Sequence, residues 1–191
     1  MSKYLLLLLY LCTFSAYAAD PKDIEKLTKI DSAPSAKGLD LSNTDLRSYQ
    51  FTPGKIDFKN ANLSHANLSN VNLENIDLSN ADLSYADLTN AKLSSANMSN
   101  ANLSHANLTG ATLSLTNLED AKLNFVQLIN ANLQQANLSR ADFTCANFNN
   151  ANLSKANFAS ANISSATFTN SITADLSNYD SVIDNHVACA G

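Results

Sequence analysis

Residues 60–70 read NANLSHANLSN, in which two near-identical five-residue units, ANLSH and ANLSN, follow one another. The spacing continues along the chain, because Leu, Phe, Ile or Met occupies every fifth position from Phe58 to Phe168, giving 23 copies. A small or β-branched residue, usually Ala, stands two positions before each of them, and Thr116 is the only polar residue among these paired positions. A period of five matches neither an α-helix nor a simple β-strand.

A unit made of one short strand and one corner explains this period. Residues two apart on an extended strand share a face, so Ala61 and Leu63 are predicted to point inward and Asn62 outward. Ser64 and His65 then turn the chain into the next unit. A single coil of such units cannot bury its inward side chains, but stacked coils can, which predicts a solenoid.

The residue that closes each unit predicts two kinds of corner. At every tenth position from 60 to 170, eight of the twelve residues are Asn, whereas the eleven positions from 65 to 165 hold one Asn. A type II turn needs a positive φ at its third residue, which Gly and Asn tolerate best. We therefore expect alternate corners to use that turn, and we expect the corner at His65 not to require a left-handed residue. A period of ten also requires an even number of sides per coil.

The unit A-(N/D)-L-x-x resembles the pentapeptide repeat family, and its copies extend over residues 56–170. This resemblance implies an all-β fold, a right-handed quadrilateral β-helix with four repeats, or twenty residues, per coil. The central Leu or Phe and the preceding Ala would fill its interior. An earlier set in another register, Leu41, Leu46, Phe51 and Ile56, predicts about one more coil.

The first eighteen residues have the pattern of a secretory signal peptide. Lys3 precedes an apolar run over residues 4–14, and an Ala-Tyr-Ala sequence ends at Ala18. We predict cleavage between Ala18 and Ala19, and export to the periplasm or out of the cell. The apolar run is shorter than the ~20 residues that a bilayer span needs, so no stable membrane insertion is expected.

These observations divide the chain into four segments. They are the signal peptide 1–18, an N-terminal cap helix and linker 19–38, the repeat β-helix 39–170, and a C-terminal cap or tail 171–191.

Two cysteines, Cys145 and Cys189, remain after removal of the signal peptide. In an oxidising compartment they are candidates for a disulfide that holds the C-terminal tail. Two free thiols remain the alternative, and the cysteine spacing matches no metal motif.

Catalytic, cofactor and metal sites are not expected. His65 and His105 share a predicted column with Tyr85 but lie two coils apart, or ~10 Å for coils stacked ~4.8 Å apart. That is too far for one zinc ion, whose ligand nitrogens lie ~2.0–2.1 Å from the metal. The pair Ser104-His105 indicates no catalytic triad, because serine is the commonest residue at this corner position of the repeats.

Outward positions are mostly Ser, Asn and Thr, so large apolar or aromatic residues there are exceptions. An exposed cluster of them can mark a binding site. Repeat drift, or a surface covered by the C-terminal tail, is the alternative. The candidate interaction surface consists of Tyr85, His105, Leu115, Phe125 and Ile129.

Charge separates two hypotheses about function. Residues 58–170 carry seven acidic and five basic side chains. This is a weak field beside duplex DNA, which has one charge per ~1.7 Å of axis. A basic stripe for nucleic acid is also missing from the sequence. The first hypothesis is an exported, non-enzymatic structural or protein-interaction module, whose partner is an unidentified protein or a second copy bound through the C-terminal end. The alternative, implied by the family resemblance, is a cytoplasmic DNA mimic that binds gyrase.

Overall fold

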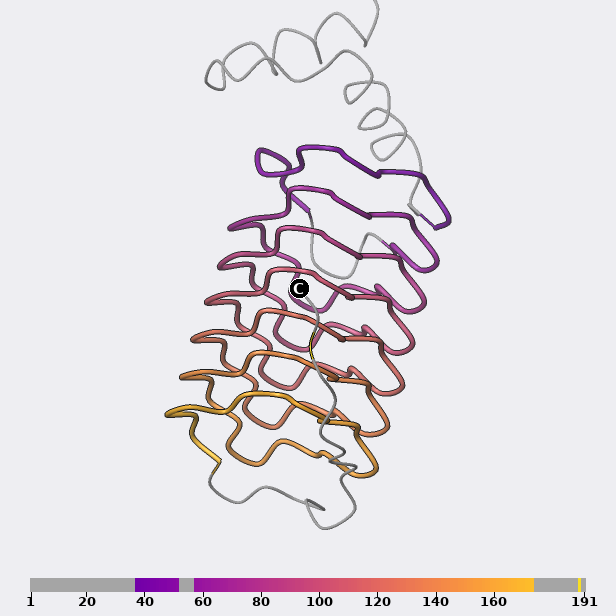
Figure 1. The fold of residues 1–191 in the computed structure, drawn as a ribbon. Coiled ribbons are helices and arrows are strands. Elements are labelled where there is room, and N and C mark those ends of the chain that lie inside the picture. The colour runs from indigo at the N-terminus through magenta and orange to yellow at the C-terminus, as the bar shows by residue number, and fades with distance from the viewer. Residues whose placement is uncertain (1–36, 52–56, 174–188, 190–191) are drawn as a thin grey trace, which may run out of the picture.

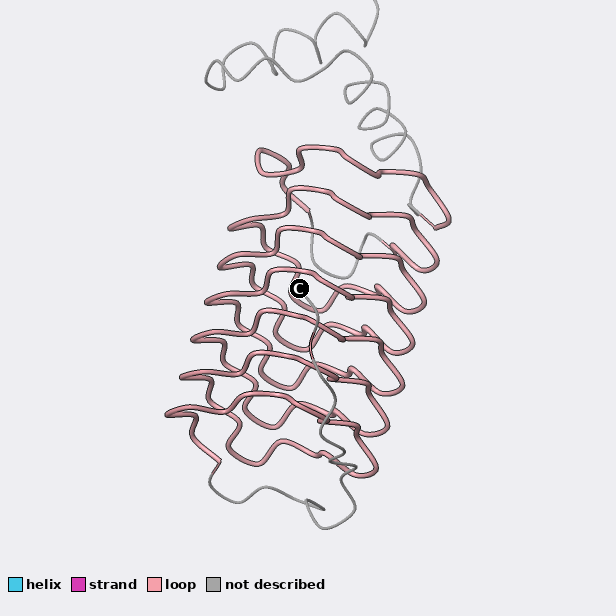
Figure 2. Cartoon of the chain, in the orientation of Figure 1, coloured by secondary structure: helices cyan, strands magenta, loops and turns pink. Residues whose placement is uncertain are grey.

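The computed structural model describes residues 37–51, 57–173 and 189. Within these ranges the backbone forms no helix and no strand longer than an isolated parallel β-bridge (Figure 2). From residue 57 onward each bridge joins a residue to the one twenty positions later, as in Asp57 with Asp77 and Asn152 with Ile172. One coil therefore contains four five-residue units, and the coils stack into a rod (Figure 1). The fold is a quadrilateral β-helix.

Neighbouring coils are joined by backbone hydrogen bonds in both directions. The Asp82 N–H donates to the Ala61 carbonyl of the preceding coil at 2.9 Å. The Leu83 N–H donates to the Asn102 carbonyl of the following coil at 2.7 Å. Two adjacent residues of one short strand thus bind two different coils, so each coil in the middle of the rod is held from both sides.

The corner explains why Asn or Asp precedes the inward Leu. The Ala86 N–H donates to the Leu83 carbonyl at 3.1 Å and closes the turn. The Tyr85 N–H donates to a carbonyl of the next coil at 3.0 Å. The Ser84 N–H has no such backbone partner and donates instead to Asp82 Oδ1 at 3.0 Å. A side-chain oxygen two residues earlier thus accepts a hydrogen bond from the N–H group that has no backbone acceptor at the corner.

The interior is filled by the two inward residues of each unit, as predicted. Leu63, Leu83 and Leu103 are at most 1% exposed, and the alanines that precede them are buried to the same degree. Thr116, the one polar residue in this series, donates its hydroxyl to the Leu93 carbonyl at 2.8 Å. A buried hydroxyl needs a hydrogen-bond partner, and the Thr116 hydroxyl has one inside the core.

The prediction that alternate corners have different backbones is wrong. His65 and Tyr85 have φ values of 57° and 59°, and Asn70 and Asn90 have values of 62° and 56°. Positive φ recurs at every fifth residue from Asn60 to Asn170, with Gly110 in the same conformation. The hydrogen bonds and buried side chains of the repeat impose this geometry on every corner. They outweigh the ~1–2 kcal/mol that a left-handed conformation costs most residues.

The first described coil is longer than the others. Asp40 bridges Asn62 and Asp45 bridges Asn67, so both pairs are 22 residues apart instead of 20. The two additional residues lie between Asp45 and Asp57. The inward residues of this coil in the earlier register are buried: Leu41, Leu46 and Phe51.

The predicted signal peptide, including the cleavage site at Ala18 and Ala19, lies outside the described residues, as does the predicted cap helix up to residue 36. Residues 174–188 of the predicted C-terminal cap lie outside them as well. In the part of the chain that is described, no helix has the length and apolarity required to cross a bilayer.

Candidate functional site

One corner of the coil stack carries aromatic side chains on consecutive coils. We call it the ladder corner and define it by positions 65, 85, 105, 125, 145 and 165, which the twenty-residue register places above one another. His65, Tyr85, His105 and Phe125 occupy its first four positions. All four have φ between 57° and 61°.

The four rings stack face to face. The ring centroids of His65 and Tyr85 are 4.9 Å apart, those of Tyr85 and His105 are 4.6 Å apart, and those of His105 and Phe125 are 4.8 Å apart. The planes of neighbouring rings differ by 1–4°. Because the spacing matches the distance between neighbouring β-strands, the coil repeat itself brings the rings into contact. Stacked aromatic pairs contribute ~0.5–1.5 kcal/mol each.

The stacking determines what this surface can bind. Tyr85 has a ring on each of its faces and yet is 53% exposed, so its edge and hydroxyl are what it presents to solvent. His105 is covered on both faces in the same way. A nucleobase needs a free aromatic face to stack upon. The middle of the ladder therefore suits contact with the side chains and backbone of a protein better than stacking of a base.

The five residues of the candidate surface do not lie together. Tyr85, His105 and Phe125 form the ladder, with Phe125 half-buried. Leu115 is 58% exposed but belongs to the corner at positions 75, 95, 115, 135 and 155, two corners away along the coil. Ile129 is half-buried and stands beside the corner at 130. The apolar exceptions thus divide into one ladder and two separate residues.

The two exposed histidines are separated as the register requires. Tyr85 lies between His65 and His105, and its ring contacts both. Among the described residues, no group of three or more His, Cys, Asp and Glu side chains is arranged to hold a metal ion.

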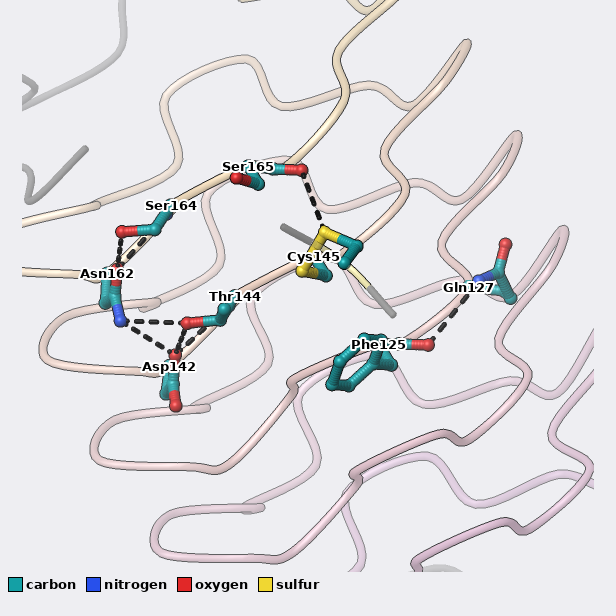
Figure 3. Close-up of a disulfide and its surroundings, with 9 residues drawn as sticks. Phe125, Gln127, Asp142, Thr144, Cys145, Asn162, Ser164 and Ser165 are labelled. Carbon is teal, nitrogen blue, oxygen red and sulfur yellow. Dashed lines mark hydrogen bonds between the residues drawn. A yellow bond between two sulfur atoms is a disulfide. The ribbon is translucent and has the colours of Figure 1, made fainter. Parts of the chain in front are cut away.

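Cys145 is the next residue of the ladder corner after Phe125 (Figure 3). It forms a disulfide with Cys189, with the two Cα atoms 5.8 Å apart. The bond joins positions 44 residues apart in the sequence. Of the two arrangements open from the sequence, the structure contains the disulfide.

A third corner carries an ion pair instead of stacked rings. Arg140 donates to both carboxylate oxygens of Asp120, which lies one coil earlier, at 2.8 and 2.7 Å. It also contacts Glu119. Hydrogen bonds donated by the Arg140 guanidinium lower the pKa of the Asp120 carboxyl, and the bonds that it donates to Asp120 and Glu119 raise the pKa of Arg140. These charges are exposed, so they shape the surface more than they stabilise the fold.

Comparison with known proteins identifies the class. The model of the family described as pentapeptide repeats matches eight copies, over residues 56–94, 96–135, 121–158 and 136–172. The chain belongs to the pentapeptide repeat family, and its fold is the right-handed quadrilateral β-helix of that family. No curated protein sequence matches the chain significantly.

Several solved structures match the chain, and of the three that follow the first is similar in fold. QnrB1, a plasmid-mediated fluoroquinolone resistance protein, is 19% identical with a TM-score of 0.59, covering 80% of this chain and 78% of that one. A pentapeptide repeat protein from the Arabidopsis thaliana thylakoid lumen is 29% identical with a TM-score of 0.49, covering 50% of this chain and 66% of that one. HetL, a pentapeptide repeat protein involved in heterocyst differentiation regulation from the cyanobacterium Nostoc sp. strain PCC 7120, is 32% identical with a TM-score of 0.31, covering 74% of this chain and 81% of that one.

Proposed function

We propose that this pentapeptide repeat protein is an exported, non-enzymatic interaction module, and that the ladder corner is the surface that contacts its protein partner. The observation that carries the proposal is the row of four rings at left-handed positions. A left-handed conformation is costly for bulky residues and cheap for Gly and Asn. Asn occupies five of the six positions of the corner at 70–170 and three of the six at 60–160, yet none of the six positions of the ladder corner.

Rigidity supports a binding role. The Tyr85 backbone is fixed by its hydrogen bond to the next coil, and its ring is fixed by two neighbouring rings. Little conformational entropy is then lost when a partner binds, because the contact groups are already ordered.

Two features support export. The sequence of residues 1–18 has the pattern of a signal peptide. The Cys145–Cys189 disulfide is of the kind that persists in oxidising compartments, whereas cytosolic thiols are kept reduced.

Charge weighs against the alternative role of a cytoplasmic, gyrase-binding DNA mimic. Residues 58–170 carry seven acidic and five basic side chains, and Glu119 and Asp120 both form ion pairs with Arg140. The fold similarity to QnrB1 at 19% identity concerns architecture alone.

Site-specific photo-crosslinking in the native cell tests the binding surface. A photoreactive residue at position 85 lies on the ladder corner, and one at position 95 lies on the opposite corner of the same coil as a matched control. We expect a discrete protein adduct from position 85 that position 95 does not give. Equal adducts from both positions, or none from position 85, would overturn the ladder as the binding surface.

The variant Tyr85→Asn sharpens this test, because Asn suits the left-handed corner and leaves the coil intact. We expect it to abolish the contact of the ladder with the partner while the far-ultraviolet circular dichroism stays unchanged. Binding that persists in Tyr85→Asn combined with His105→Asn would contradict the proposal.

Cell fractionation with N-terminal sequencing tests export separately. We expect a product outside the cytoplasm that begins at Ala19. A cytoplasmic product that retains Met1 would overturn export, and inhibition of gyrase supercoiling by that product would then favour the DNA-mimic alternative.

A further inference from the structure

Cys145 is mounted rigidly on the coil stack, independently of its disulfide. The residue before it is bonded to the preceding coil, because the Phe125 N–H donates to the Thr144 carbonyl at 2.9 Å. The last coil adds contacts, since Asn162 Nδ2 donates to Asp142 Oδ1 at 3.1 Å and to Thr144 Oγ1 at 2.9 Å (Figure 3). The bond to the preceding coil does not involve the last coil, so this half of the disulfide stays in place whether or not the disulfide exists.

Cys189 is the other half and is exposed at the surface. Its Sγ lies 4.0 Å from the Ser165 carbonyl, the next position of the ladder corner. The covalent loop between the two cysteines runs from 145 to 189 and so encloses the last described coil, residues 154–173. A disulfide that closes this loop constrains the last coil and leaves the coils that precede Cys145 outside the loop.

The last coil is also the part of the repeat with the weakest packing. Ile163 is 4% exposed, and Ala166 and Phe168, which stand at inward positions, are only half-buried. Leu and Ala at the equivalent positions of the middle coils are at most 1% exposed. A terminal unit of a solenoid has one neighbouring unit of its own kind instead of two. Its local stability is therefore lower than that of the units in the middle.

We propose that the Cys145–Cys189 disulfide is a redox-released clasp that holds the C-terminal coil against the rest of the β-helix. When a dithiol reductant is present, one of its thiolates attacks the exposed Cys189 sulfur, and Cys145 leaves as a thiolate. The second thiol of the reductant then displaces the Cys189 thiolate, so that the protein disulfide gains two electrons and two protons and the dithiol is oxidised to a disulfide. The C-terminal coil is then released while the coils before it stay folded.

The positions of the hydrogen bonds explain why reduction should release the C-terminal coil and leave the coils before it folded. In the middle of the stack the coils are joined by bonds such as Asp82 to Ala61, which are far from the disulfide and independent of it. In the last coil, Thr167 donates to Ala146 and Ile172 donates to Ala151, and these bonds lie within the enclosed loop. Reduction is therefore expected to affect the second group and spare the first.

Hydrogen exchange measured by mass spectrometry on the purified mature chain tests the clasp. With dithiothreitol as the reductant, we expect amides of residues 154–172 to exchange at least tenfold faster and amides of residues 62–132 to stay within twofold. Reoxidation should restore the original rates. The variant Cys189→Ser, without reductant, should reproduce the fast exchange and should not respond further to dithiothreitol.

Two results would overturn the clasp. Unchanged exchange in residues 154–172 after complete reduction would mean that the disulfide does not hold the coil. Acceleration of all amides together would mean that it stabilises the entire β-helix instead of one end. Thiol counting with a chromogenic disulfide reagent confirms that reduction is complete in either case. None of these outcomes depends on the proposed binding role of the ladder.

Discussion

The ladder corner and the corner that follows it have the same backbone and different surfaces. At positions 70, 90, 110, 130, 150 and 170, which we call the asparagine corner, every residue is Asn except Gly110. The φ values there are 56–70°, against 57–61° at the first five positions of the ladder corner. The comparison shows that the corner residue does not select the turn. The inward residues and the hydrogen bonds between coils select it, so the corner side chain is free to vary.

The energies involved are small enough to permit this freedom. A left-handed backbone costs a residue other than Gly or Asn ~1–2 kcal/mol. Ring stacking, at ~0.5–1.5 kcal/mol per pair, offsets a similar amount when neighbouring coils both carry rings. Two corners with identical geometry can therefore carry different chemistry at nearly equal stability.

The largest expected effect comes from the interior that imposes the common geometry. Leu103→Ala should lower the free energy of unfolding by about 2–5 kcal/mol, because a fully buried side chain is lost and a cavity remains. Urea denaturation measures the difference. His105→Asn in the same coil is the control and should change stability by about 1 kcal/mol or less, since the lost stacking is offset by a residue suited to positive φ. Equal losses in the two variants would contradict the division of roles between interior and corner.

An intermediate effect is expected within the asparagine corner. Gly110 has a φ of +70°, and a Cβ atom there would lie 2.3 Å from Asn90 Oδ1, so that side chain must move. Gly110→Ala should therefore destabilise the protein by about 1–2 kcal/mol, mainly through the left-handed backbone. Thermal unfolding at fixed pH measures it. Gly38→Ala measures the cost of the left-handed backbone without the contact with a neighbouring side chain. Gly38 has a φ of +69°, and no neighbouring group lies within 4 Å of its Cβ position. An increase in stability in Gly110→Ala would show that this corner does not require a left-handed backbone.

The smallest expected effect concerns the corner that carries the ion pair. Arg140 hydrogen bonds lower the pKa of the Asp120 carboxyl, so this interaction favours the folded state above the ordinary Asp range and is lost as the pH falls through the lowered value. In Arg140→Gln the pKa of Asp120 should rise toward its ordinary value. An NMR titration of the side-chain carboxyl carbon reports it. The unfolding midpoint at neutral pH should barely change, because exposed ion pairs contribute little. An unchanged pKa would mean that the pair does not persist in solution.

Much of the fold could be predicted from the sequence because its strongest signal, the fifth-residue period, is set by burial. Ala61 and Leu63 point inward as expected, and the shifted register of Leu41 and Leu46 forms a coil. The corner at His65 was mispredicted because a residue preference was treated as a requirement. The free energy gained by Asn at a left-handed corner is little larger than that gained by ring stacking. The residues at a corner therefore do not reveal its backbone conformation.

The candidate site was predicted in part for a related reason. Tyr85, His105 and Phe125 are twenty residues apart and therefore share a corner, whereas Leu115 and Ile129 stand at other positions of the twenty-residue register. Hydrophobicity alone does not reveal this difference. The parallel arrangement of the rings and the covering of their faces depend on side-chain rotamers, which the sequence pattern does not specify. The pairing of Cys145 with Cys189 depends on the course of the chain after the repeats.

The first coil contains two residues more than those that follow, yet the bridge between Asp57 and Asp77 restores the twenty-residue register at once. The two additional residues are thus absorbed within one coil, and the next coil has the regular length. For protein engineering, this makes the corners suitable places to graft loops or tags. For evolution, it means that such a rod can acquire insertions one corner at a time without losing the alignment of its remaining surface columns.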